Sequence, residues 1–480
     1  MLFNSGEFLW LLAITFALYY VPWSLGRHGK AWQVTTALAA SVVFYGWENP
    51  SLLALLAVSC VGNSVATARI IMHKVAGDEA WVKRWVRIAV ILNLSLLAIF
   101  KYAKMLTFLP EDWRNVINSI PLPIGISFYT FHGISMIVDV ARGEVTRESD
   151  ELVSHGARFA KGVRDIGFYL LFFPQLVAGP IVKAKQFWPQ IAAKRFSDIA
   201  WGTVVRSLIT GYFLKMVVAD NLGEQTVTLT KPWMTQLGPL DLVCLLYGYS
   251  LQIFADFAGY SLIAIGLAAM FGYRFPINFN FPYLSTSVTE FWRRWHMSLS
   301  GWLRDYLYIP LGGNRKGEAR TYLNLFLVMF LGGLWHGAEW KFALWGSLHG
   351  LLLAIERLTF RKRSPDKMPS KVSAILGWFY TFHAVTLLWL TFLMPDLRQI
   401  GLFFHQVIIP ERWHGPVIFV PLVFGSAAVL YHAAGWVREH RQVLFSRFRG
   451  SLAEGLAYGA MLFLIFTNAG APGGFIYFQF

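Results

Sequence analysis

The sequence predicts an all-α integral membrane protein that crosses the bilayer many times. Of its 480 residues, 56% are hydrophobic, 16% are aromatic and only 14% are charged. A transmembrane helix needs roughly 20 mainly apolar residues, and stretches of this kind recur along the whole chain. Backbone polar groups must bond internally in lipid, so these stretches are helices. We expect a single membrane domain over residues 1–480, with roughly 11–13 helical elements and some re-entrant or interfacial helices.

The expected spans fall into three groups along the chain. Those of the N-terminal third cover residues 7–25, 32–47, 51–72, 87–108 and 122–140. The stretches 166–182, 201–219 and 236–272 are apolar but interrupted, by Pro174, Gly179-Pro180, Asp220-Asn221 and Asp256. We expect re-entrant or half-length helices there, because such breaks need protein or water to receive the freed backbone groups. Spans resume at 322–335, 340–356, 372–394, 416–435 and 453–470.

Charge sets the expected orientation. Lys and Arg number 42 against 27 Asp and Glu, a net charge of +15. In a membrane protein this excess belongs to cytoplasmic loops, so the loops Arg357–Lys371 and Arg438–Arg449 are predicted to be cytoplasmic, and the N-terminus and the tail Ala471–Phe480 to lie outside. The N-terminus lacks a basic n-region, so the first span is expected to be retained. No soluble basic and aromatic module indicates nucleic-acid binding.

Chemistry is expected between Thr289 and Gly350. From Glu290 to Arg320 the chain is too charged to span and too aromatic for a free loop. As one helix, this stretch would present a single apolar side, which predicts an interfacial or inward-dipping helix. That side would hold Trp292, Trp295, His296, Leu299 and Leu303.

Two histidines of this region are candidate catalytic residues, because imidazole exchanges a proton near neutral pH. His336 follows Gly332-Gly333 and precedes Gly337, and these small residues allow a ligand chain to approach closely. It is a candidate general base for an acceptor hydroxyl. With it, His296 could polarise a thioester carbonyl. The alternatives are a packed His336 and an interfacial His296.

A metal site is not expected. Only Cys60 and Cys244 occur, which gives neither a disulfide framework nor a cysteine metal site. His349 lies 13 residues after His336, about 220° around an ideal helix, so the two cannot face one ion without a break.

Other polar groups have simpler interpretations. The run Gly312, Gly313, Asn314, Arg315, Lys316 offers backbone N–H groups and cations for a phosphate-bearing thioester arm, or is an ordinary basic turn. Asp139 and Glu356 are expected to be span-end charges at the interface.

Several segments resemble the membrane-bound O-acyltransferases, in particular the bacterial branch that acetylates polysaccharides such as alginate. They are PIGISFYTFHGISMIVDVARG, FFPQLVAGPIVK, FADFAGYSLIAIGLAAMFGYRFPINFNFPYLS, TEFWRRWHMSLSGWLRDYLYIPLGGNRKG, LGGLWHGAEW and FIYFQF. The resemblance implies a ring of helices around a funnel, with His336 in the place of the catalytic histidine and His296 in that of the second active-site residue. At His132 it implies an acidic residue, which weakens the choice of alginate as the polymer.

The C-terminus also resembles that branch. A companion peptide of teichoic acid D-alanylation ends in F-x-Y-x-x-F with the Tyr as an acyl relay, and this chain ends Phe475-Ile476-Tyr477-Phe478-Gln479-Phe480. The resemblance implies that Tyr477 is an acyl relay; an aromatic interfacial anchor is the alternative.

These observations predict an O-acyltransferase of the bacterial inner membrane, with no tightly bound cofactor. Acetyl-CoA or another acyl thioester would be the cytoplasmic donor, and an exported polysaccharide of alginate or cellulose type the acceptor. Periplasmic acetyltransferase or esterase-like proteins are the expected partners. The alternatives are D-alanyl transfer to a teichoic-acid-like polymer and a non-catalytic polysaccharide or lipid exporter; for an exporter the chain lacks internal repeats and intramembrane charge pairs.

Overall fold

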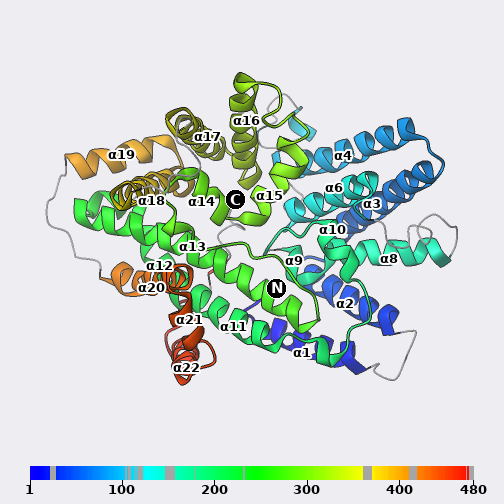
Figure 1. Cartoon of the computed structure of the whole chain (residues 1–480), viewed down its shortest axis with the longest axis horizontal. Helices are drawn as coiled ribbons and strands as arrows, with labels where there is room; N and C mark the ends of the chain where they lie inside the picture. Colours follow the sequence, from blue (N-terminus) through cyan, green and yellow to red (C-terminus); the bar gives the residue numbers. More distant parts are fainter. Residues whose placement is uncertain are drawn as a thin grey trace. The chain divides into compact units, whose positions relative to one another are not determined.

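The structure is a computed structural model in which the described residues form helices and no strands (Figure 1). It describes all residues except 22–28, 103–104, 106–109, 114, 116–122, 146–156, 178, 231–232, 361–369, 410–418, 472 and 475–480. These residues fall into two compact units, one of residues 1–207 and 263–276, the other of residues 208–262 and 277–480. The predicted all-α class is confirmed.

The first unit is built on long helices joined by buried polar contacts. Its elements are α1 (Gly6–Tyr20), α2 (Gly29–Gly46), α3 (Leu52–Val75), α4 (Glu79–Tyr102), α6 (Ile126–Arg142), α8 (Ala157–Leu171), α9 (Phe173–Leu176) and α10 (Ala184–Phe187). Helices α3, α4 and α6 lie side by side in Figure 1. Asn63 and Asn93 exchange side-chain hydrogen bonds of 3.3 and 3.0 Å, and a Cβ at Gly133 would lie 2.7 Å from the Asn63 amide oxygen. A small residue and an amide pair are typical of helix contacts in membranes.

The second unit contains the histidine-bearing segments. Its elements include α12 (Asp220–Thr226), α14 (Val288–Arg294), α15 (Met297–Leu303), α16 (Glu318–His336), α17 (Trp340–Phe360), α18 (Lys371–Leu393), α19 (Leu397–Ile408), α20 (Val420–His440), α21 (Gln442–Phe448) and α22 (Leu452–Thr467). Helices α11 (Trp201–Tyr212) and α13 (Pro239–Met270) contribute residues to both units.

The pair α16 and α17 carries His336 at its turn. The two helices lie side by side in Figure 1. They approach through glycines, because a Cβ added to Gly346 would lie 3.0 Å from the Cα of Gly333. Small residues on both sides of a helix contact bring the backbones together, and here they fix the end of α16.

Six helices of the described residues are long and apolar enough to cross a membrane, and a seventh span results if the bent pair α21 and α22 is counted as one. The six are Leu52–Val75, Glu79–Tyr102, Trp201–Leu229, Pro239–Met270, Lys371–Leu393 and Val420–His440. The multi-pass prediction is confirmed. The predicted spans 7–25, 32–47, 122–140, 322–335 and 340–356 overlap helices α1, α2, α6, α16 and α17, none of which is among the six.

Two of the predicted interruptions are absent. Residues 239–270 form one continuous helix, and helical structure runs from Trp201 through Asp220 to Leu229 with a π-helical stretch at Phe213–Ala219. Asp220 and Asp256 do not break their helices because both carboxylates pair with the same lysine, Lys215. Charge pairs within candidate spans are therefore present, and the prediction that the chain lacks them is wrong. The break predicted in 166–182 is confirmed, since α8 ends at Leu171 and α9 at Leu176.

Candidate active site

His296 lies at a break between two short helices, which corrects the prediction of one helix. Helix α14 ends at Arg294, and α15 begins at Met297 after His296 itself takes a left-handed conformation, with φ 43°. The segment before α14 causes the break: the Met297 N–H donates to the Asn278 carbonyl (2.9 Å), and the Asn280 N–H donates to the Arg294 carbonyl (2.9 Å). A left-handed non-glycine residue is uncommon and often belongs to a functional site.

Asn278 fixes the tautomer of His296. Its amide oxygen accepts from the Ser298 N–H (3.3 Å) and the Ser298 hydroxyl (2.8 Å), and its amide nitrogen donates to the Ser261 hydroxyl (2.9 Å). A backbone N–H only donates, so the shared atom is the oxygen. His296 Nδ1 lies 3.1 Å from that oxygen and therefore carries the proton.

The other nitrogen of His296 is a proton acceptor. His296 is fully buried, and burial lowers the pKa of its ring, so the ring is neutral. With the proton on Nδ1, Nε2 holds a lone pair, and it has no hydrogen-bond partner among the described residues. Polarising a carbonyl oxygen would require a donor at this position, so a neutral His296 accepts a proton instead.

His336 is the last residue of α16 and is 3% exposed. Its ring packs at right angles on Trp345, with centroids 5.2 Å apart, and on Phe392 at 5.4 Å. Gly337 then leaves the helix in an extended conformation, and a Cβ there would overlap the Phe342 ring. Both histidine rings lie near the Trp335 indole, whose centroid is 6.0 Å from that of His296 and 5.0 Å from that of His336.

His336 lines a cavity of about 530 Å³. The wall is mainly apolar, and its further polar members are Ser300, a threonine, a tyrosine and two arginines. Other lining residues are Thr289, Trp292, Arg293, Met297, Leu299, Gly301, Leu303, Arg304, Tyr308, Leu325, Val328, Met329, Gly332, Trp345 and Leu353. The volume is in the range of small-molecule sites. Gly332, one of the small residues before His336, lines this cavity.

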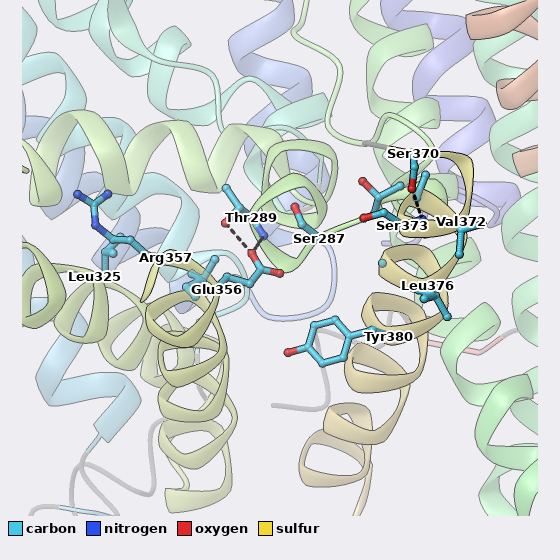
Figure 2. Close-up of a pocket in the computed structure, with 14 residues that line it drawn as sticks. Ser287, Thr289, Leu325, Glu356, Arg357, Ser370, Val372, Ser373, Leu376 and Tyr380 are labelled. Atoms are coloured by element: carbon cyan, nitrogen blue, oxygen red, sulfur yellow. Dashed lines mark hydrogen bonds between the residues drawn. The ribbon is translucent and has the colours of Figure 1, made fainter. Parts of the chain in front are cut away.

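A second cavity, of about 990 Å³, adjoins the first (Figure 2). Thr289, Leu325 and Leu353 line both. The second cavity is bordered by Arg357 at the end of α17 and by Ser370 at the start of α18. Figure 2 shows the Tyr380 ring pointing into the same space as the Glu356 carboxylate. The shared residues place the two cavities next to each other, one bordered by Arg357 and the other by His336.

Glu356 is a buried helix cap, which corrects its interpretation as an interfacial charge. It is 5% exposed, and its carboxylate accepts from the Val288 N–H, the Thr289 N–H (2.9 Å) and the Thr289 hydroxyl (2.8 Å). These are orphan donors at the N-terminus of α14, where a negative charge is favourable. Asp139 is likewise buried, and accepts from Ser135 Oγ (3.2 Å) and the Lys185 N–H (3.1 Å).

Comparison with known proteins decides the family. The chain is 38% identical to the probable alginate O-acetylase AlgI of Pseudomonas aeruginosa over 417 residues, 83% of this chain and 73% of the relative. Residues 164–394 match the membrane-bound O-acyltransferase family. The chain belongs to that family.

Other members show its breadth. The chain is 34% identical to the peptidoglycan O-acetyltransferase of Helicobacter pylori, over 83% of this chain and 78% of the relative. It is 28% identical to the teichoic acid D-alanyltransferase of Bacillus subtilis, over 75% of this chain and 90% of the relative. The protein is therefore a multi-pass membrane O-acyltransferase, and the predicted family, enzyme class and reaction type are confirmed.

For an acyltransferase, the run Gly312–Lys316 offers less than predicted. The N–H groups of Gly312, Gly313 and Arg315 donate within the turn, to the carbonyls of Ile309, Tyr308 and Gly312 at 3.0, 2.9 and 3.1 Å. The Gly313 carbonyl accepts from the Asn324 side chain (2.8 Å). None of the five residues lines the His336 cavity, which ends at Tyr308.

His349 has a structural role beside the acyltransferase cavity. Its Nδ1 accepts from Trp292 Nε1 at 3.3 Å, and its ring packs on Trp345 at 4.7 Å. It thus holds two indoles of the cavity wall in place. No group of three or more His, Cys, Asp or Glu suited to a metal occurs among the described residues.

Three positions complete the account. Tyr477 lies outside the described residues. His132 is fully buried in α6, where its ring packs on Tyr169 at 5.4 Å, and it does not line the cavity of His336. Asn278 was missed in the sequence, because an Asn in an aromatic run gives no signal of its long-range partners.

Proposed function

We propose that this acyltransferase takes an acetyl group from a cytoplasmic thioester donor and passes it across the bacterial inner membrane for O-acetylation of an exported or cell-surface polysaccharide. The observation that carries the proposal is the pair of adjoining cavities that ends at His336. Positive loops face the cytoplasm, so the mouth beside Arg357 is the donor side. The predicted donor, polymer and compartment are all part of this proposal.

His336 is the general base in the proposed reaction. It takes the proton of an attacking hydroxyl as that oxygen forms a bond to the thioester carbonyl carbon, and it returns the proton to the thiolate when the C–S bond breaks. The cavity also offers donors for the oxyanion that develops on the carbonyl oxygen. Ser300 Oγ and Trp345 Nε1 are buried, belong to lining residues and have no hydrogen-bond partner among the described residues.

His296 assists as a second acceptor. In this proposal its Nε2 lone pair orients a hydroxyl. Neither His296 nor Trp335 lines the cavity of His336; the Trp335 ring lies 6.0 Å from the His296 ring and 5.0 Å from the His336 ring. Since the Asn278 bond keeps the proton on Nδ1, the ring presents one fixed face. A lone pair on Nε2 cannot donate to the oxyanion, so this proposed role of His296 differs from the predicted polarisation of the thioester carbonyl.

The donor is acetyl-CoA or another acyl thioester, bound as a substrate. Arg293 and Arg304 line the cavity of His336, and Arg357 borders the adjoining one. These cations, together with Arg315 and Lys316, suit the phosphates of a pantetheine-type arm. The apolar wall suits the acyl chain.

Tyr477 is the proposed relay. Its phenol oxygen attacks the thioester carbonyl, loses its proton to His336 and carries the acetyl group as a phenyl ester. A polysaccharide hydroxyl, or a periplasmic acetyltransferase or esterase-like partner, then takes the group and restores the phenol. A free phenol has a pKa near 10, so it needs such a base at neutral pH.

D-alanyl transfer is the second candidate. It is favoured by the 28% identity to the teichoic acid D-alanyltransferase of Bacillus subtilis over 90% of that protein. The same His336 chemistry serves either acyl group. A non-catalytic exporter is disfavoured by the family.

The test is acyl transfer by purified protein in lipid nanodiscs, with radiolabelled acetyl-CoA or a D-alanyl carrier thioester. His336→Ala should remain folded and lose transfer, by about 10²-fold to 10⁴-fold as for loss of a general base. His405→Ala, an exposed histidine of α19, is the matched control and should keep wild-type activity. Full activity of His336→Ala would exclude it as the base.

Mass spectrometry of the same protein tests the relay. An acetyl ester on Tyr477 should accumulate when no acceptor is present. Tyr477→Phe keeps the aromatic ring and removes only the oxygen. Wild-type polymer acetylation in that variant would leave the tail as an anchor and reject the relay.

A further inference from the structure

Three charged side chains are buried together outside the cavity of His336. Lys215 Nζ lies 2.6 Å from Asp220 Oδ1 and 2.8 Å from Asp256 Oδ1, and the three side chains are 3%, 3% and 4% exposed. The Tyr260 ring lies 5.4 Å from the same ammonium. Ionisable groups inside membrane spans are costly and mark functional positions.

The local backbone is shaped to bring these charges together. Lys215 lies in the π-helical stretch Phe213–Ala219, a geometry that is rare and frequent at functional sites. Helix α13 reaches it through Gly259, where a Cβ would lie 2.9 Å from both the Gly211 carbonyl oxygen and the Lys215 nitrogen. The approach of α13 therefore depends on a glycine beside the cluster.

The residues that follow α22 contact the segment next to this cluster. Helix α22 ends at Thr467, and the next residues bond to the segment that follows Lys215. The Gly470 N–H donates to the Met216 carbonyl (2.9 Å), and the Ala471 N–H donates to Glu224 Oε1 (2.8 Å). In the other direction, the Asn221 side chain donates to the Asn468 carbonyl (2.9 Å).

Glycines let this segment lie directly on the cluster. A Cβ at Gly470 would lie 2.7 Å from the Asn221 nitrogen and 2.8 Å from the Asp220 carbonyl carbon, which are backbone atoms that cannot rotate away. The Gly473 N–H bonds to the Asp220 carboxylate, and a Cβ there would lie 3.1 Å from Oδ1. At Gly474 a Cβ would meet nothing within 4 Å. The contact thus ends at Gly473.

We propose that the Lys215–Asp220–Asp256 cluster is the docking site of the C-terminal segment Asn468–Gly474, and that this docking positions Tyr477. The second half rests on the proposed relay. An extended chain covers at most about 3.3–3.6 Å per residue, so the Cα of Tyr477 stays within roughly 11 Å of that of Gly474. Docking therefore confines the Cα of Tyr477 to this radius, which raises the effective concentration of its phenol near the docked segment. The cluster residues act through the tail and are positioning residues.

Hydrogen exchange of the full-length protein in nanodiscs tests the docking without any reference to activity. Peptides that cover Asn468 onward should be protected in the wild type. Gly470→Val should raise their exchange rate by about tenfold or more, because the local bonds to Met216 and Glu224 open. Gly474→Val, a matched change at an open position, should stay within about twofold of wild type. Asp220→Ala should behave as Gly470→Val.

Peptides from α16 and α17 report in the same experiment whether the rest of the protein is folded. Gly470 lies after α22, so its substitution changes no residue within a described helix. Wild-type protection in Gly470→Val would overturn the docking site. If protection is lost, single-turnover formation of acetyl-Tyr477 should fall by a similar factor while Gly474→Val remains normal.

The outcomes separate the docking from the relay. Loss of protection with an unchanged rate of Tyr477 acetylation would overturn the positioning role and leave the docking. Absence of acetyl-Tyr477 in the wild type itself would overturn the relay, and the exchange data would then decide the docking alone.

Discussion

Replacement of Asn278 by Ala should lower acyl transfer although Asn278 does not line the cavity. The change removes the acceptor of His296 Nδ1–H and of both donors of Ser298. Without it, the proton of the neutral ring can move to Nε2, the nitrogen that is the proposed acceptor. Outer hydrogen-bond partners of functional histidines in metal sites are worth about 10-fold to 100-fold, and we expect a loss of transfer in this range.

The structure also predicts a cost in stability. Three buried donors lose their acceptor, and each costs about 1–3 kcal/mol if left unpaired. Activity must therefore be expressed per folded molecule, measured by size-exclusion chromatography and thermal unfolding in detergent. Ser261→Ala is the control: it removes only the acceptor of the Asn278 amide nitrogen (2.9 Å) and leaves the His296 bond in place. It should keep transfer within about threefold of wild type, as expected for loss of one neutral hydrogen bond.

Asn278→Asp gives the sharpest readout, a pH profile. Burial lowers the pKa of His296, so the wild-type ring stays neutral at about pH 6–8 and adds no step to the profile there. A carboxylate beside Nδ1–H favours the charged ring and raises this pKa. Protonated Nε2 cannot accept a proton, so transfer by Asn278→Asp should fall as the pH decreases. A flat profile in that variant together with full activity of Asn278→Ala would refute the role of Asn278.

The remaining predictions concern His296, the orientation and the α14 cap. His296→Ala should reduce transfer by about 10²-fold, the lower end for an acid/base partner, and wild-type turnover in a filter-binding assay would reduce it to a packing residue. Reporter fusions in the loops Arg357–Lys371 and Arg438–Arg449 should read cytoplasmic and one after Phe480 periplasmic, by the positive-inside rule; a cytoplasmic C-terminus would exclude an external relay. Glu356→Ala should lower stability by about 0.5–2 kcal/mol through loss of the α14 cap, measured by thermal unfolding, with the exposed Glu339→Ala as a control that leaves the melting temperature unchanged.

Much of the fold could be predicted from composition and periodicity, because a membrane imposes one local solution on every apolar stretch. The helices α3, α4, α18 and α20 fall within or close to predicted spans. The candidate base could also be predicted, since His336 is flanked by Gly332, Gly333 and Gly337, and small residues allow a ligand to approach closely. What local pattern could not supply was the partner of each buried polar group.

The break at His296 illustrates this limit. The spacing of Trp292, Trp295 and Leu299 fits a continuous helix, and nothing in the stretch itself opposes it. The helix ends because Asn278, 18 residues earlier, supplies hydrogen bonds that replace those of the next helical turn. The hydrogen bonds of Asn278 thus outweigh the local preference for a continuous helix, and they place the His296 ring beside the Asn278 amide.

Buried charges show the same effect with the opposite result. Asp256 in an apolar run predicts an interruption, because a lone carboxylate in lipid costs several kcal/mol. The helix nevertheless continues, since Lys215 lies within 2.8 Å. Asp220 pairs with the same lysine at 2.6 Å, and its carboxylate also accepts the N–H of Gly473. Asp220 was also predicted to interrupt its helix, so a residue that misled the local prediction is one that contacts the segment after α22.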